Sequence, residues 1–268
     1  MRRSTFRTTV ALATAASIAA CSDAGGPSAG GQVNFNLATR PAGAPTAAVH
    51  VASFATLGTP ETFTDGTNTL VVDRVQLVLR EIELKRAEAT VNCGEDAGHD
   101  ACEKLELGPV LLDLPLGGAG GAARSFSVPV DAGTYDEVEF EIHKPSHDED
   151  AAFVQANPDF DGVSVKVTGT YNGVGFAYTT DLDAEEEIEL ASPLAVTGTA
   201  ATDLTLFVDL DRWFRDGTGG LVDPLTANAG GANEGVVESN IKGTLHAFED
   251  ENEDGADDHG GDHGGTDD

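Results

Sequence analysis

Hydrophobic and polar residues alternate along most of the chain, and the clearest alternation lies on both sides of Asn172-Gly173. This dipeptide is the preferred pair for a two-residue type I′ β-turn. The pairs predicted outward from the turn are Tyr171 with Val174, Gly169 with Phe176, Val167 with Tyr178, Val165 with Thr180, and Val163 with Leu182. Because turn chemistry and the hydrophobic face select the same register, residues 163–182 are predicted to form a β-hairpin.

Two more segments show the same period of two. Residues 135–143 place apolar side chains on one face of a predicted strand and an acidic, wet face on the other. The apolar residues are Val138, Phe140 and Ile142, and the polar ones are Glu137, Glu139, Glu141 and His143. Between residues 70 and 85 the alternation slips by one position at Arg80-Glu81, which indicates a β-bulge within a continuous strand.

Shorter apolar runs complete the pattern. They predict strands within 33–37, 49–56, 105–116, 126–130, 204–210 and 236–248, and one short helix within 148–157. No long apolar pattern of period 3.6 occurs after the first twenty residues, which argues against a helical bundle. With 32 glycines and 11 prolines the chain is rich in turns. We therefore predict an all-β fold, an antiparallel β-sandwich of one domain.

The N-terminus has the layout of a secretory signal. Three arginines precede an apolar run that is too short to span a bilayer, and the run ends in Ile18-Ala19-Ala20-Cys21. These four residues resemble the lipobox of bacterial lipoproteins, in which the cysteine thiol takes the lipid. The alternative is cleavage at an Ala-x-Ala site, with Cys21 incidental. By analogy with lipoprotein sorting, Ser22 in place of aspartate predicts export to the outer membrane of a Gram-negative cell envelope.

The resulting domain scheme has four parts. Residues 1–20 are the signal peptide, and 21–48, rich in Gly, Ala, Ser and Pro, are a disordered flexible tether. Residues 49–248 form the sandwich, and 249–268 form an acidic tail rich in His, Gly and Asp. With Cys21 lipidated, Cys93 and Cys102 remain to close one loop as a disulfide. A metal site made of both thiolates and His99 is the alternative.

The net charge of the chain restricts the classes of partner that it can bind. The formal net charge is −31, and removal of the signal arginines makes the mature chain more acidic still. Such a surface argues against nucleic acid and against anionic lipid headgroups, so the membrane is reached through the lipid anchor alone. Divalent cations are the natural counter-charge.

Two stretches near the C-terminus resemble a known group of proteins. They are Asp209-Leu210-Asp211-Arg212-Trp213-Phe214-Arg215-Asp216-Gly217 and the segment from Asn240 to Gly255. Both look like segments of uncharacterised bacterial lipoproteins with a domain of unknown function related to the prealbumin-like, or transthyretin-like, β-sandwiches. This resemblance implies a sandwich and implies no activity.

The acidic tail contains a candidate calcium site. Asp250, Asn252, Asp254 and Gly255 match the opening of a calcium loop, and Asp258 falls at its ninth position. The twelfth position is Gly261 instead of glutamate, so the segment is no EF-hand and would bind calcium weakly. The alternative is a solvated acidic tail whose composition produces the pattern by chance.

Histidines near carboxylates offer two candidate transition-metal sites. The first joins Glu141 and His143 of the acidic strand face to His147, which the following loop can fold back. The second is His259 and His263 in the tail, because neutral imidazole is a good ligand for zinc and copper. A solvated outer face and a disordered tail are the alternatives.

Catalytic motifs are absent from the sequence. It has no His-Glu-x-x-His, no Gly-x-Ser-x-Gly and no Walker loop, so we expect no enzyme. The expected function is that of an exported, lipid-anchored binding or structural module, calcium-binding through its tail. The alternatives are a lipoprotein that handles zinc or copper and a sandwich that binds carbohydrate through Trp213, Phe214 and Tyr178. A protein or glycan partner is left open.

Overall fold

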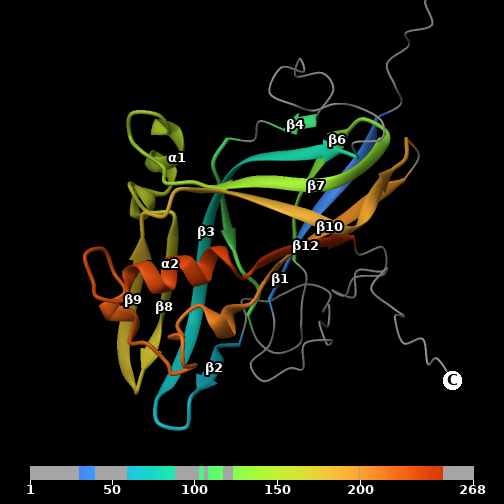
Figure 1. Ribbon diagram of the computed structural model, residues 1–268. Coiled ribbons are helices and arrows are strands. Elements are labelled where there is room, and N and C mark those ends of the chain that lie inside the picture. Colours follow the sequence, from blue (N-terminus) through green and yellow to red (C-terminus); the bar gives the residue numbers. More distant parts are fainter. Residues whose placement is uncertain are drawn as a thin grey trace, which may run out of the picture.

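Two β-sheets pack against each other around one hydrophobic core (Figure 1). The computed structural model describes residues 30–39, 59–87, 103–105, 108–116, 123–198 and 200–249. Most strand pairs in this part are antiparallel, which confirms the predicted all-β sandwich. The predicted strand at 49–56 lies outside the described residues.

The smaller sheet has four strands and contains one parallel pair. In order across the sheet they are β12 (Leu245–Glu249), β11 (Ala201–Val208), β1 (Gly31–Thr39) and β6 (Ala123–Val130). β1 runs parallel to β11 and antiparallel to β6, so the sandwich is not purely antiparallel. The prediction of a tether over 21–48 is wrong for residues 31–39, because Val33, Phe35 and Leu37 enter the core and burial of apolar surface stabilises the strand.

The larger sheet is built around one long strand. Its main order is β10 (Ala184–Val196), β7 (Gly133–Ile142), β3 (Thr69–Arg86), β8 (Val165–Tyr171) and β9 (Val174–Thr180). Three short strands also pair with β3: β2 (Glu61–Thr64), β4 (Glu103–Leu105) and β5 (Val110–Asp113). The long β3 therefore connects the hairpin of β8 and β9 to the acidic strand β7.

The hairpin of β8 and β9 follows the predicted register from Tyr171–Val174 to Val165–Thr180. Asn172 and Gly173 have φ values of 51° and 78°, as a type I′ turn requires. The fifth predicted pair, Val163 with Leu182, is wrong because β8 begins at Val165. The N–H of Ser164, the residue before β8, donates to the Thr180 carbonyl, and the regular pairing of the two strands ends at this point.

The predicted β-bulge is present in β3. The register of β3 against β7 shifts between Arg80 and Ile82, and Glu81 has a φ of 49°. The extra residue restores the inward direction of Ile82 and Leu84, both of which are buried. The bulge also places Arg80 directly opposite Glu141 of β7.

Helices are few and short in the described part of the chain. The predicted helix within 148–157 is confirmed as α1 (Ala151–Ala156), followed by the 3₁₀ turn η1 (Pro158–Phe160). The other 3₁₀ turns are η2 (Leu210–Arg212) and η3 (Pro224–Thr226). None of the helices described in the structure has the length and apolar character needed to cross a membrane.

Two elements were mispredicted or missed. The predicted strand 236–248 is wrong over its first part, where α2 (Glu234–Lys242) forms, and only β12 is extended. Val237 and Ile241, four residues apart, are both fully buried, so this segment follows the spacing of a helix and not that of a strand.

Strand β10 was not predicted from the sequence. Its exposed positions Glu185, Glu187 and Glu189 do alternate with more buried residues, but the run of glutamates hides this alternation.

Candidate metal centre

An acidic face is formed where β7 and β10 lie side by side. Glutamates of the two strands stand directly opposite one another. The facing pairs are Glu185 with Glu141, Glu187 with Glu139, and Glu189 with Glu137. Like charges in such positions are destabilising, so the face needs cations. The neighbouring strand β3 supplies two, Arg80 and Lys85.

Lys85 neutralises one half of this face. Its Nζ lies 2.5 Å from Glu137 Oε1, 2.8 Å from Glu139 Oε2 and 3.2 Å from Glu187 Oε1. Burial lowers the pKa of Lys85. The hydrogen bonds to these glutamates raise it by a larger amount, so the pKa lies above its ordinary value. This group of three carboxylates therefore already holds a cation.

The carboxylate of Glu185 is repelled by the neighbouring glutamates. Its hydrogen bond with Glu139 and the negative charge of that residue raise the pKa of Glu185 to about 7. Near neutral pH the pair of carboxyl groups therefore shares a proton for part of the time. The acidic face is consequently a region where added positive charge is favourable.

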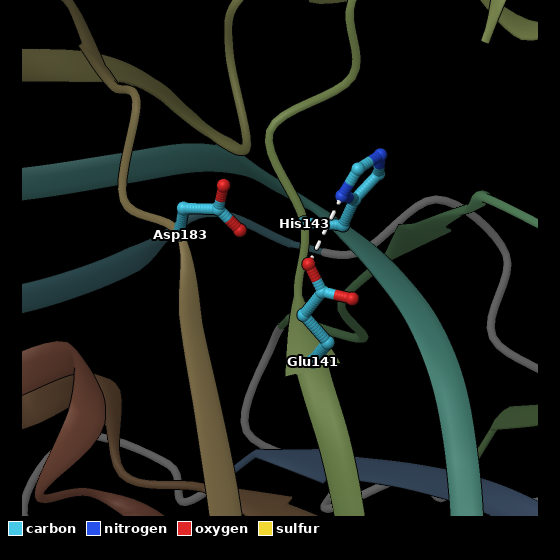
Figure 2. A group of neighbouring side chains, drawn as sticks. All are labelled: Glu141, His143 and Asp183. Atoms are coloured by element: carbon cyan, nitrogen blue, oxygen red, sulfur yellow. Dashed lines mark hydrogen bonds and ion pairs between the residues drawn. The ribbon is translucent and has the colours of Figure 1, made fainter. Parts of the chain in front are cut away.

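The other half of the face ends at His143, which follows the last residue of β7. The main-chain N–H of His143 donates to the Val78 carbonyl, and the residue is only 2% exposed. Its Nδ1 lies 3.2 Å from Glu141 Oε1 (Figure 2). Its Nε2 lies 2.8 Å from Asp150 Oδ2. The ring is thus held between two carboxylates.

Asp183, the residue directly before β10, approaches the same histidine. Its carboxylate is directed toward the strand that carries Glu141 and His143 (Figure 2). One potential ligand atom from each of the three residues lies within 4.8 Å of the others. Two ligand atoms on a tetrahedral zinc ion lie roughly 3.3 Å apart. A modest inward movement of the exposed Asp183 side chain would therefore complete three metal ligands.

Arg80 and Asp150 set the charge around these three residues. Arg80 holds Glu141 with two hydrogen bonds, Nε to Oε2 at 2.9 Å and Nη2 to Oε1 at 3.2 Å. Burial raises the pKa of Asp150. Its interactions, chiefly the hydrogen bond to His143, lower it by a larger amount, so the pKa lies below its ordinary value. The carboxylates of Glu141, Asp150 and Asp183 outnumber the single guanidinium of Arg80, so added positive charge is favourable here.

The structure brings together part of the predicted transition-metal site. Glu141 and His143 are adjacent as expected, but His143 is buried instead of lying on a wet face. The expectation that His147 folds back is wrong, since this residue is exposed beside α1. A turn in which the Asp150 N–H donates to the Ser146 carbonyl reverses the chain and carries Asp150 to the ring instead.

Sequence reasoning missed two residues of the site. Asp183 was missed because β10 was not recognised, and only the pairing of β10 with β7 brings it near His143. Asp150 lies inside the segment 148–157 that was predicted to hold a short helix, and in the structure it directly precedes α1, at a position where aspartate is a common cap.

Several predicted site residues lie outside the described residues. They are Cys21, the disulfide partners Cys93 and Cys102, the calcium ligands Asp250, Asn252, Asp254 and Asp258, and the tail histidines His259 and His263. These assignments stay predictions.

The aromatic residues considered for sugar binding belong to the core. Trp213, Phe214 and Tyr178 are each at most 2% exposed, and the rings of Tyr178 and Phe214 meet edge to face with centroids 5.2 Å apart. A sugar needs an exposed ring face for stacking, so these residues do not provide a carbohydrate platform.

Comparison with known proteins leaves the chain without an assigned family. No family model matches it, and no curated protein matches it. Among solved structures, MbnP from Methylosinus trichosporium is similar to this chain with 11% sequence identity and a TM-score of 0.41. The match covers 82% of this chain and 99% of the other. A likeness at this level supports no inference about function.

Proposed function

We propose that this protein is an exported, lipid-anchored, non-catalytic β-sandwich module that binds a divalent transition-metal ion through Glu141, His143 and Asp183. The observation that carries the proposal is the buried His143 ring, whose Nδ1 faces the Glu141 carboxylate while the Asp183 carboxylate reaches toward both. A neutral imidazole and an ionised carboxylate each offer lone pairs, so a cation between them is favourable.

The donor set favours zinc or copper over calcium. One imidazole nitrogen and two carboxylate oxygens suit borderline divalent ions, whereas calcium takes six to eight oxygen ligands. Calcium remains our prediction for the separate acidic tail, through Asp250, Asn252, Asp254 and Asp258.

Zinc titration of the mature chain tests the site. The titrations use a background with His259→Ala and His263→Ala, so that zinc bound by the tail does not contribute. We expect Asp183→Asn to weaken zinc affinity at least about tenfold, because replacing even an outer-shell partner costs that much. Asp183 is exposed, so the substitution leaves the core intact. Isothermal titration calorimetry measures the affinity and the number of sites.

Asp161→Asn is the control, because Asp161 is also an exposed aspartate and belongs to no group of possible metal ligands in the described part of the chain. Its expected zinc affinity is that of the parent protein. His143→Ala should abolish the site, with circular dichroism used to check that the sandwich persists. Equal zinc affinity of the parent and both site variants would contradict the proposal.

The anchor is tested separately at Cys21. We expect the wild-type protein to partition with membranes and to carry a lipid on its new N-terminus, which mass spectrometry detects. Cys21→Ser should remain soluble or unprocessed, because the hydroxyl cannot take the thioether-linked lipid. A Cys21→Ser protein that is processed at the same site and stays membrane-bound would refute the anchor.

A further inference from the structure

A second group of carboxylates lies where α2 crosses the end of the β8–β9 hairpin (Figure 1). It consists of Asp181, directly after β9, and of Glu234 and Glu238 on α2. One carboxylate oxygen from each residue lies within 4.8 Å of the other two. Glu234 and Glu238 are four residues apart on one side of the helix, where like charges are destabilising. Two segments that are distant in the sequence thus bring three negative charges together.

Little positive charge offsets this group. Lys144 Nζ lies 3.4 Å from Asp181 Oδ2, but the two side chains are 39% and 53% exposed. An ion pair in such contact with water contributes little, and one ammonium group cannot balance three carboxylates. The group therefore differs from the glutamates around Lys85, which already surround a partly buried ammonium.

The two glutamates are held in place by uncharged donors. Glu234 Oε2 accepts a hydrogen bond from the Gly230 N–H at 2.9 Å. Glu238 Oε1 accepts one from Thr180 Oγ1 at 2.5 Å. These bonds orient the carboxylates without cancelling their charge.

A buried hydroxyl lies beside the same carboxylates and makes no hydrogen bond. Tyr178 of β9 is fully buried, and its Oη has no partner in the part of the chain that the structure describes. Burial raises the pKa of this phenol, Thr180 lowers it, and the charges of Glu238 and Glu234 raise it, so the hydroxyl is directed toward the group. Burial of an unpaired hydroxyl is unfavourable, and a phenol can both donate and accept.

We propose that Asp181, Glu234 and Glu238 bind a calcium ion that joins the end of the hairpin to α2, and that a water molecule on this ion bonds to the Tyr178 hydroxyl. The donors are all oxygen atoms, which calcium prefers, whereas the imidazole of His143 suits zinc or copper. Calcium–oxygen distances of about 2.4 Å place neighbouring ligands roughly 3 Å apart, so a small inward movement of the exposed Asp181 completes the set. Three carboxylates are fewer than the six to eight ligands that calcium takes, so water supplies the rest.

The test is thermal unfolding of the mature chain with and without calcium, followed by circular dichroism. The background carries Asp250→Ala and Asp254→Ala, so that calcium bound by the tail does not contribute. Because an ion that binds the folded state stabilises it, we expect the midpoint of the parent to rise at calcium concentrations of about 1 to 10 mM. Asp181→Asn and Glu238→Gln should each weaken calcium affinity at least about tenfold and lose most of this rise.

A control with the same change of charge is needed, because any divalent cation screens the charge of so acidic a chain. Asp161→Asn provides it, since Asp161 is exposed and belongs to no group of possible metal ligands among the described residues. This variant should keep the full rise of the parent. An equal rise in the parent, Asp181→Asn and Glu238→Gln would overturn the site and reduce the effect to general screening.

Tyr178→Phe tests the water contact separately. Without calcium, the variant should be at least as stable as the parent, because it removes a hydroxyl that is buried without a partner. Calcium should raise its midpoint by less than that of the parent, because the bound water has lost its acceptor. If calcium raises both midpoints equally while Asp181→Asn abolishes the rise, the ion is supported and the contact with Tyr178 is overturned.

Discussion

Replacement of Gly169 by alanine is expected to lower the free energy of unfolding by about 3 kcal/mol, the upper part of the range for overpacked interiors. Gly169 lies in β8, opposite Val72 of β3 and Phe176 of β9. A Cβ at this position would overlap the backbone oxygen of Val71 and press on the Phe176 ring. Because a backbone oxygen of a central strand cannot rotate away, β3 and β8 would have to separate locally.

Gly175→Ala is the matched control. Gly175 lies on the partner strand β9, and no atom lies within 4 Å of a Cβ built there. Its expected change in stability is within about 0.5 kcal/mol, as for most surface substitutions. Urea unfolding followed by tryptophan fluorescence measures both variants. Equal midpoints for the two alanine variants would show that the strand pair adapts to the added methyl group.

Trp213→Ala is expected to lower the free energy of unfolding by about 4 kcal/mol, because it leaves a large cavity in the core. Trp213 is 1% exposed, and its Nε1 donates to Thr244 Oγ1 at 2.9 Å. The main-chain oxygen of Trp213 accepts a hydrogen bond from Asn240 Nδ2 at 3.1 Å. The residue therefore connects η2 both to α2 and to the turn before β12.

Two gentler substitutions separate packing from hydrogen bonding at this position. Trp213→Phe should cost less than Trp213→Ala, because much of the apolar volume remains. Thr244→Val keeps the volume but leaves the indole N–H buried without its acceptor, at a cost of about 1 to 3 kcal/mol. Trp213 is the single tryptophan, so unfolding is followed by circular dichroism in its variants. A loss below about 1 kcal/mol for Trp213→Ala would contradict a core role for this residue.

The amino-acid sequence by itself determined the features that depend on near neighbours. Asn172-Gly173 sets the register of its hairpin, because the backbone of a two-residue turn leaves one pairing and the hydrophobic face agrees with it. The slip at Arg80-Glu81 locates the bulge for the same reason, since period two must be restored on the inner face. The short helix α1 and the acidic strand β7 were also recognisable from their own residues.

The tertiary structure alone decided the features that depend on distant segments. The parallel pairing of β1 with β11 joins residues about 170 positions apart, and no local pattern specifies such a partner. The candidate metal site has the same origin. Glu141 and His143 share a strand end, but Asp183 reaches them only because β10 lies beside β7. Asp150 reaches the ring because the loop reverses at Ser146, and the spacing of the side chains along the sequence does not show that this turn brings Asp150 rather than His147 to the histidine.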